Sequence, residues 1–207
     1  IRRAHAGHTR PHSMSEGTRI NRVVVVGASV AGLQTTESLR QFGYEGKLIL
    51  LDGEKEFPYN KPPLSKEILT GDLDDDDIRT LTPDLVEHLD VDLRLGVRAR
   101  GLSIGEKILE TDSGSVEYDR IVVATGADPI IPSAWARLEG VTALRTLNDA
   151  RFIRAALDSS TRVVVLGGGF LGCEVAASAR RKGATVSLIA RSPALMSRAL
   201  HYRAAAP

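Results

Sequence analysis

The chain contains Val23-Val-Val-Val-Gly-Ala-Ser-Val-Ala-Gly32, a pattern typical of a buried parallel strand that runs directly into a tight turn and a helix. Gly27 and Gly32 occupy the first and last positions of the G-x-G-x-x-G dinucleotide fingerprint, and Ser29 occupies the middle one. Small residues let backbone N–H groups approach a diphosphate, and the helix N-terminus offers it unpaired donors. Two further small residues complete the expected binding turn, Ala28 and Ala31. Taken alone, the match leaves a plain strand–turn–helix as an alternative, because short glycine motifs also occur by chance.

A second copy of the pattern follows at Val163-Val-Val-Leu-Gly-Gly-Gly-Phe-Leu-Gly172, with glycine at all three fingerprint positions, Gly167, Gly169 and Gly172. The first and last glycines of the two copies are separated by the same number of residues. Two such units in one chain indicate two nucleotide sites, commonly one for a flavin and one for a nicotinamide. We therefore predict an α/β fold with two Rossmann-like dinucleotide-binding units, the second of which is incomplete. We expect two more residues in the second binding turn, Phe170 and Leu171.

Composition excludes several classes of protein. The 207 residues are 43% hydrophobic and 26% charged, and the net charge of +1 points to neither a nucleic-acid nor a membrane partner. Cys173 is the one cysteine, so the chain forms no internal disulfide, and a reducing cytoplasm is expected. We interpret Cys173 as a packed small residue rather than a nucleophile, since no histidine base is close in sequence. No apolar run approaches the roughly 20 residues of a transmembrane helix.

Residues 1–19 are polar and basic and show no apolar periodicity, so we expect a disordered leader. His5, His8 and His12 could be read as a metal cluster, but nothing nearby would order these ligands, and no metal site is predicted. We interpret Met14 as the natural start of the protein.

Two acids follow the expected second strand, Lys47–Leu51. Asp52 follows Gly32 at the spacing of about 20 residues that the fingerprint requires, and a carboxylate there can accept hydrogen bonds from both ribose hydroxyls of an adenosine. Glu54 is the second candidate for this role. The alternative is that Asp52 is a solvated acid in a turn.

The segment Asn60-Lys-Pro-Pro-Leu-Ser-Lys66 resembles the Arg-Pro-Pro-Leu-Ser-Lys segment of the ferredoxin-reductase branch of the FAD/NAD-linked reductases. In that family the prolines lie against the flavin and the lysine lies near the reactive edge of the isoalloxazine. The resemblance assigns these roles to Pro63 and Lys66, and it makes Lys61, which replaces an arginine, a further cofactor-binding candidate. Ser65 is expected to be the N-cap of a helix that carries Lys66 in its first turn.

The segment Tyr118-Asp-Arg-Ile-Val-Val-Ala-Thr-Gly-Ala127 contains another expected buried strand, Ile121–Ala124, followed by small residues. Its Ala-Thr-Gly triplet resembles the family motif that closes the FAD domain, where the chain passes close to the cofactor. The resemblance therefore implies that three residues adjoin FAD, Ala124, Thr125 and Gly126. It also places Ala99 against the adenine through its backbone. Asp128 stands where family members usually carry a basic residue.

The resemblance places Glu174 near the nicotinamide and within reach of Lys66, whereas simple complementarity to the helix dipole is the alternative. The strand expected over 185–190 ends without the acid that an NAD site requires, and Arg191 follows it. This combination favours a 2′-phosphate and therefore NADPH, with NADH as the alternative. Arg198 is a second candidate to contact that phosphate.

The remaining pattern predicts a helix over 30–42, a solvated acidic loop over 72–77 and an antiparallel β element at 107–111 and 115–118. We expect an FAD-binding domain over 20–132 and a partial NAD(P)-binding domain over 133–207. The chain stops at Pro207, before the further strands that a nicotinamide domain needs, so a truncated or frame-shifted reductase is expected.

The resemblance implies an FAD-dependent oxidoreductase that passes electrons from NAD(P)H through FAD to a ferredoxin or a similar iron–sulfur acceptor. The alternative is a non-catalytic remnant that at most binds nucleotide. A disulfide reductase is disfavoured because a second cysteine is missing. The pattern does not indicate an oligomeric state.

Overall fold

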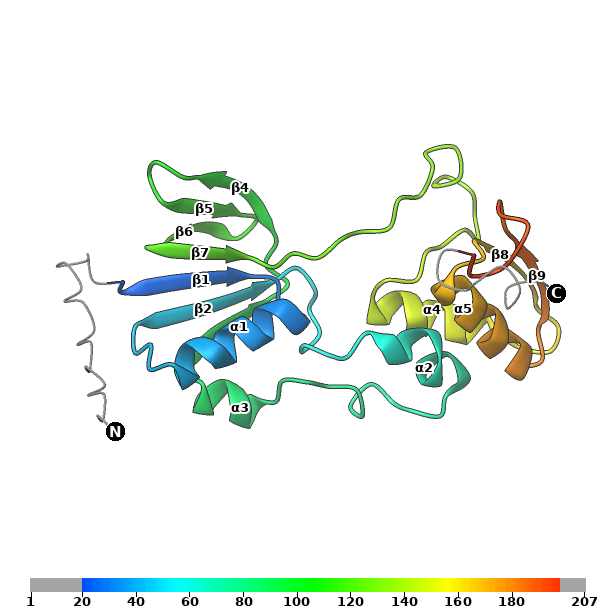
Figure 1. Ribbon diagram of the computed structural model, residues 1–207, viewed down its shortest axis with the longest axis horizontal. Helices are drawn as coiled ribbons and strands as arrows, with labels where there is room; N and C mark the ends of the chain where they lie inside the picture. Colours follow the sequence, from blue (N-terminus) through cyan, green and yellow to red (C-terminus); the bar gives the residue numbers. More distant parts are fainter. Residues whose placement is uncertain (1–19, 198–207) are drawn as a thin grey trace, which may run out of the picture.

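The computed structural model describes residues 20–197 and shows two units joined by extended segments (Figure 1). The first unit contains a parallel sheet with α1 (Val30–Gln41) and α3 (Pro83–His88), together with a small antiparallel sheet. The second unit contains α4 (Leu147–Ala156), α5 (Phe170–Arg181) and a two-stranded parallel sheet. This architecture confirms the predicted α/β class, with two Rossmann-like units of unequal size.

The parallel sheet of the first unit has the strand order β3-β2-β1-β7. Its strands are β1 (Arg22–Val26), β2 (Lys47–Asp52), β3 (Val91–Leu95) and β7 (Arg120–Val123). The apolar runs of β1 and β2 are buried on both faces, which is why these strands are continuously hydrophobic rather than alternating. Because the strands are parallel, β1 and β7 end side by side, and each delivers its following turn to the same edge.

The second face of this sheet is covered by the three-stranded antiparallel sheet β4-β5-β6. Leu109 on β5 (Ile108–Thr111) and Val116 on β6 (Gly114–Glu117) pack in one cluster with Val24 and Ile49. The predicted antiparallel element is therefore present. The pattern did not predict its third strand, β4 (Ala99–Ser103), which is mostly exposed and polar.

The proline-rich segment packs against the second unit. It forms a 3-10 turn, η1 (Pro62–Ser65), and a short helix, α2 (Glu67–Thr70), and Figure 1 shows α2 beside α4 and α5. Its buried side chains form one cluster with residues of α4, namely Tyr59, Leu64, Ile68, Leu69, Ile78, Leu147 and Ala150. The chain between β2 and α3 thus carries residues of the first half of the sequence to the second unit.

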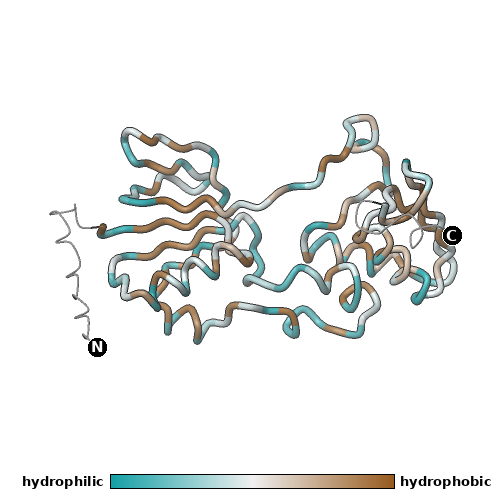
Figure 2. Tube along the Cα trace, in the orientation of Figure 1, coloured by the Kyte–Doolittle hydropathy of each residue, from teal (hydrophilic) through white to brown (hydrophobic). Residues whose placement is uncertain are grey.

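The sheet of the second unit consists of β8 (Arg162–Leu166) and β9 (Thr185–Ile189). Helix α5 packs on one face, against Val163 and Val186 among others. The opposite face is open, with Val164 60% exposed and Ile189 56% exposed. Figure 2 shows hydrophobic residues in both units.

The expected element boundaries need small corrections. Helix α1 ends at Gln41, and Phe42 is its C-cap. The expectation that Ser65 is an N-cap is wrong: Ser65 lies in η1, and Lys66 occupies the N-cap of α2. Within residues 20–197, none of the helices is both long and apolar enough to cross a membrane.

Candidate functional site

We call the turn from Gly27 to Gly32 the first cradle. Gly27 has φ +102°, and a Cβ built on it would lie 2.3 Å from the carbonyl oxygen of Ala124. A Cβ on Gly32 would lie 1.7 Å from the carbonyl oxygen of Gly27, so both positions require glycine. The first backbone hydrogen bond of α1 is Leu33 N–H to Ser29 O at 2.9 Å. The N–H groups of the first turn, which includes Ala31, therefore have no acceptor within the helix and can receive an anion.

The loop after β7 lies directly against the first cradle. Ala124 N–H donates to Val26 O at 2.8 Å, which extends the pairing of β7 with β1 by one residue. Thr125 Cα would lie 3.2 Å from a Cβ on Gly27, and Gly126 has φ +70°. The structure therefore brings together the two small-residue motifs that lie almost one hundred positions apart in the sequence.

The two acids after β2 lie beside the first cradle, and both have partners within the protein. Asp52 Oδ2 accepts from Ala28 N–H at 2.6 Å, and Asp52 Oδ1 accepts from Glu54 N–H at 2.8 Å. Glu54 accepts from the Tyr59 hydroxyl at 2.5 Å and from Lys61 Nζ at 2.8 Å. A carboxylate offers about four lone-pair sites, so Asp52 retains the capacity to accept ribose hydroxyls. The solvated-acid alternative for Asp52 does not describe this arrangement.

Tyr59 is a site residue that the pattern did not predict. Its hydroxyl also accepts from Leu147 N–H at 2.8 Å, so it joins the acid beside the first cradle to the start of α4. Burial, together with the Glu54 carboxylate, raises the pKa of Tyr59 well above its usual value. Lys61 Nζ lies 4.6 Å from the centre of the Tyr59 ring. The signal that could have found it was an aromatic residue that bears a hydroxyl, next to the proline-rich segment.

Lys66 and Glu174 meet between the proline-rich segment and α5. Lys66 Nζ lies 3.4 Å from Glu174 Oε2 and donates to Pro62 O at 2.8 Å. Glu174 Oε2 also accepts from the Ser65 hydroxyl at 2.5 Å. The buried Ser178 hydroxyl donates to Ser65 O at 2.7 Å, which fixes η1 against α5. Pro63 stands in the same turn, half-buried.

The turn from Gly167 to Gly172 is the second cradle. Gly167 has φ +124°, and a Cβ on Gly172 would lie 2.0 Å from Gly167 O, so its backbone repeats that of the first cradle. Gly169 is the N-cap of α5. This cradle is more open, with Phe170 58% exposed and Leu171 50% exposed. Cys173 is half-buried within α5, with its Sγ 3.8 Å from Gly168 O.

Two predicted residues lie apart from these contacts, and a third lies outside the described residues. Ala99 begins β4 and packs on the cluster beneath the antiparallel sheet. Arg191 is exposed just after β9 and forms no side-chain hydrogen bond or ion pair with residues 20–197. Arg198 lies outside the described residues. The roles assigned to these residues stay predictions.

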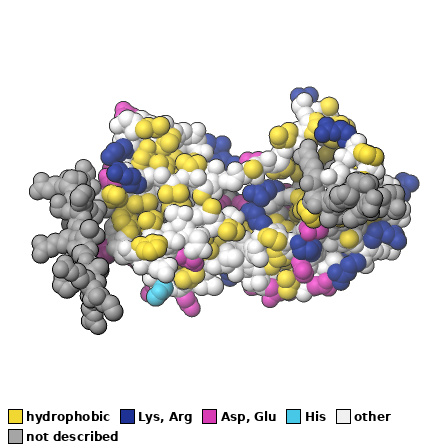
Figure 3. All heavy atoms as spheres, in the orientation of Figure 1, with side chains coloured by type: hydrophobic (Ala, Val, Ile, Leu, Met, Phe, Trp, Pro, Cys, Tyr) yellow, Lys and Arg dark blue, Asp and Glu magenta, His cyan; other side chains and the backbone are white. Residues whose placement is uncertain are grey.

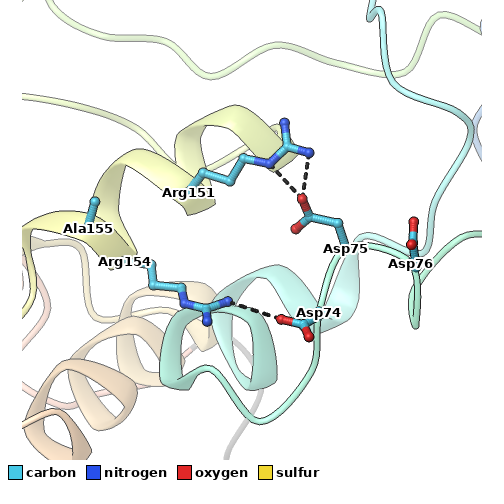
Figure 4. Close-up of a pocket in the computed structure, with 6 residues that line it drawn as sticks. All are labelled: Asp74, Asp75, Asp76, Arg151, Arg154 and Ala155. Carbon is cyan, nitrogen blue, oxygen red and sulfur yellow. Dashed lines mark hydrogen bonds and ion pairs between the residues drawn. The ribbon is translucent and has the colours of Figure 1, made fainter.

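The sequence pattern predicts a solvated acidic loop. In the structure, several of its aspartates also pair with arginines. Arg151 of α4 pairs with Asp75 at 2.5 Å, Arg154 lies 4.0 Å from Asp74, and Arg181 of α5 lies 3.0 Å from Asp72. Figure 4 shows Arg151 and Arg154 pointing toward the loop across a cavity of about 540 Å³. Three aspartates and two arginines line this cavity, and each arginine lies close to an aspartate. Among the described residues, no group of three or more His, Cys, Asp or Glu side chains is arranged to hold a metal ion.

Two strand–glycine turn–helix units, with the proline-rich segment held against the second through Lys66 and Glu174, define an α/β protein of the class with paired dinucleotide-binding units. The profile of the pyridine nucleotide-disulphide oxidoreductases matches residues 21–206. The chain therefore belongs to the pyridine nucleotide-disulphide oxidoreductase family.

Among curated proteins, the chain is 37% identical to a terpredoxin reductase of a Pseudomonas species, over 88% of this chain and 44% of that protein. It is 34% identical to the ferredoxin–NAD(+) reductase subunit of a benzene 1,2-dioxygenase system of Pseudomonas putida, over 88% of this chain and 45% of that protein. Its fold is similar to a ferredoxin reductase for the CYP199A2 system of Rhodopseudomonas palustris, with a TM-score of 0.83 and 33% identity over 89% of this chain and 46% of that one. The chain thus spans about 45% of the length of these curated relatives.

Proposed function

We propose that the protein is an FAD-dependent oxidoreductase that passes electrons from NAD(P)H, through FAD, to a ferredoxin-type acceptor. The observation that carries this proposal is the 3.4 Å contact between Lys66 and Glu174, which joins the proline-rich segment to the helix of the second cradle. The similarity to terpredoxin and ferredoxin reductases supports the choice of reaction.

The residues of the two cradles fit two diphosphate-bearing nucleotides. At Gly27 and Gly32 a Cβ would occupy space that the close approach of backbone segments already fills. At Gly167 and Gly169 a Cβ would meet no heavy atom within 4 Å, so the turn is open to a ligand. We assign FAD to the first cradle, with Asp52 or Glu54 toward its ribose, and NAD(P)H to the second.

When bound, FAD supplies the chemistry that accepts a hydride and releases single electrons. The chain's own residues position and polarise that group. Lys66 places an ammonium group that Glu174 and the Pro62 carbonyl hold in one orientation. The Ser65 hydroxyl donates to the same oxygen of Glu174. The ion pair therefore has a fixed position from which to act on the flavin edge.

For the nicotinamide, we propose a preference for NADPH. Strand β9 ends at Ile189, and the next residues, Ala190 and Arg191, offer no acid and one exposed cation. A 2′-phosphate would gain from Arg191, whereas the ribose hydroxyls of NADH lack their usual acceptor. Comparing kcat/KM for NADPH and NADH in the protein and in Arg191→Ala tests this assignment; an unchanged ratio would reject it.

For the partner, we propose a small iron–sulfur protein of the ferredoxin type, in the cytoplasm, with no role for nucleic acid or a membrane. A solved complex of putidaredoxin reductase with putidaredoxin is similar in fold to this chain, with a TM-score of 0.80 and 30% identity over 46% of the reductase. The net charge of +1 supports the absence of a nucleic-acid partner.

The test is ferricyanide reduction by the purified protein, supplied with FAD and with NADPH or NADH. We expect nucleotide-dependent turnover and the absorbance of bound flavin. Folded, FAD-loaded protein that gives a flat trace would reject the proposed reaction.

A specific observation favours a second candidate, a protein that binds adenine nucleotide without turnover. The second unit has a sheet of two strands within residues 20–197, and Val164, Leu166 and Ile189 are exposed on it. A colourless preparation that binds ADP but shows no flavin absorbance would support this candidate over the enzyme.

A further inference from the structure

Arg98 lies beside the acidic turn that follows β2. Val97 N–H donates to Asp52 O at 2.8 Å. Gly96 N–H donates to Glu54 O at 2.7 Å, so the loop after β3 is hydrogen-bonded to that turn. The Arg98 side chain is exposed and forms no hydrogen bond or ion pair with residues 20–197. Exposure alone assigns it no role, because Figure 3 shows Lys and Arg side chains at the surface of both units.

What distinguishes Arg98 is the orientation of its guanidinium, which lies flat against Gly53. A Cβ built on Gly53 would lie 3.5 Å from each of three Arg98 atoms, Nε, Cζ and Nη2. A point that is equally distant from three atoms of a planar group, and farther from them than they are from one another, lies above the plane. Gly53 therefore supports one face of the guanidinium, and the exposure of the side chain leaves the opposite face accessible.

The backbone that carries this side chain is fixed. Arg98 N–H donates to Asp112 Oδ1 at 2.9 Å, and Arg98 O accepts from Asp112 N–H at 3.1 Å. These two hydrogen bonds tie Arg98 to the end of β5 in the antiparallel sheet. Because residue 53 is glycine, no side chain displaces the guanidinium from the turn. The guanidinium is therefore placed by its surroundings, while its N–H groups keep no partner in the described part of the chain.

This flat cation stands next to the position that the proposed function gives to an adenosine. Asp52 or Glu54 is directed toward the ribose hydroxyls of the dinucleotide in the first cradle. The base is bonded to C1′ of that ribose, which is the neighbour of the carbon that carries the 2′-hydroxyl. A base whose ribose meets either acid therefore lies close to Gly53, the residue between them. Guanidinium groups stack on aromatic faces, and every nucleobase has such a face.

We propose that Arg98 binds the adenine of the dinucleotide in the first cradle by stacking the accessible face of its guanidinium on the base. This inference rests on the proposed assignment of FAD to that cradle. A flat base suits the site better than an anion does, because the guanidinium presents a face and not its N–H edge at the turn. Arg98 thereby favours FAD over a flavin mononucleotide, which has no adenine.

The experiment compares Arg98→Met with Arg120→Met. Arg120 is an exposed arginine that begins β7, at the opposite end of the parallel strands, so the control removes the same charge elsewhere in the first unit. Calorimetry measures the binding of ADP and of ribose 5-diphosphate, which lacks the base, and quenching of flavin fluorescence measures FAD. We expect Arg98→Met to weaken ADP and FAD by about 3- to 10-fold, as the loss of an exposed stacking contact requires. Ribose 5-diphosphate in Arg98→Met, and all three ligands in Arg120→Met, should stay within about twofold.

The outcomes separate the inference from the proposed function. Unchanged ADP and FAD affinity in Arg98→Met would overturn the inference alone, because the protein would still bind FAD. Equal weakening of ADP and ribose 5-diphosphate would also overturn it, since the guanidinium would then act on the phosphates. Failure of the unmodified protein to bind FAD would overturn the proposed function and the inference with it.

The ligand-free melting temperature serves as the folding control. Arg98→Met should melt within about 2 °C of the unmodified protein, because the exposed side chain has no bonded partner to lose. If this variant does not fold, Arg98→Lys decides, since lysine keeps the charge but has no planar face. Arg98→Lys should bind ADP about threefold more weakly or worse, with ribose 5-diphosphate unchanged; ADP affinity equal to that of the unmodified protein would overturn the inference.

Discussion

A Cβ on Gly27 would lie 2.3 Å from the carbonyl oxygen of Ala124, whereas a Cβ on Gly167 would meet no heavy atom within 4 Å. The backbones of the two cradles are alike, since both glycines have a strongly positive φ and both lead into a helix. Their surroundings differ because β1 lies between two strands, whereas β8 has one neighbouring strand within the described part of the chain. The equivalent strand residues show the same contrast, with Val24 fully buried and Val164 60% exposed.

The comparison teaches that a repeated sequence motif specifies a local turn and not its environment. The turn follows from the glycines and the apolar run, which are local. Whether the turn is enclosed depends on β7 and on the loop at Ala124. These residues are distant from β1 in the sequence, but β7 pairs with β1 in the sheet. Substitutions in the first cradle should therefore destabilise the protein more than the equivalent substitutions in the second.

The largest expected effect on stability is at the first glycine of each cradle. Gly27→Ala should lower the free energy of unfolding by about 3 kcal/mol or more, because it adds a backbone clash to the strain of a positive φ. Gly167→Ala, which meets the strain without the clash, should cost about 1–2 kcal/mol. Urea denaturation followed by circular dichroism measures both. Equal losses would show that the enclosure of the first cradle is not what distinguishes it.

Alanine substitutions at the two equivalent valines should have different effects on stability in β1 and in β8. Val24→Ala should cost about 2–3 kcal/mol, since it removes buried methyl groups and leaves a cavity. Val164→Ala should change stability by less than about 0.5 kcal/mol, because its side chain is mostly exposed. The same denaturation experiment applies. A large loss at Val164 would mean that the open face of β8 and β9 is covered in solution.

Tyr59→Phe tests the link between the first cradle and α4. The variant leaves Leu147 N–H, on a residue 3% exposed, without its acceptor, so we expect a loss of about 1–3 kcal/mol at neutral pH. The pKa of Tyr59 is raised in the folded protein, so its neutral form stabilises the fold below the unfolded pKa of about 10. That contribution declines as the pH rises above about 10. The alkaline decline should therefore be shallower in Tyr59→Phe; identical alkaline limbs would contradict the role of its hydroxyl.

A small effect on stability is expected at the ion pair between the proline-rich segment and α5. Lys66 and Glu174 have side chains 40% and 36% exposed, so Lys66→Ala should change the free energy of unfolding by less than about 1 kcal/mol. On the proposed function, it should nevertheless slow reduction of bound flavin by NAD(P)H in stopped-flow measurements. Lys47→Ala, which breaks a comparable pair with Asp92, is the matched control and should leave that rate unchanged. An unchanged rate in Lys66→Ala would remove its assigned role.

Much of this fold could be predicted from local patterns. The valine runs before Gly27 and Gly167 specify buried parallel strands, and the following glycines specify the turns. The approach of Lys66 to Glu174 could not come from spacing, since 108 positions separate them, and it was expected through the family resemblance alone. Their roles toward a cofactor stay predictions.

Other parts of the site could not be predicted, because they depend on long-range packing. Tyr59 contacts Leu147, which lies 88 positions further along the sequence, and no sequence pattern marks either residue as part of a site. Asp52 was expected to face a ribose, but its contact with Ala28 N–H depends on how β2 aligns with β1. Sequence pattern alone contains no information on these alignments.

The acidic loop is held against α4 and α5 by electrostatic contacts. The pairs Arg151–Asp75, Arg154–Asp74 and Arg181–Asp72 are all partly exposed to solvent. Dissolved ions screen exposed charges over a Debye length of about 8 Å at physiological ionic strength. The loop is therefore held most tightly in dilute buffer and less tightly at high salt, so the ionic composition of the solution governs how rigidly it lies against the two helices.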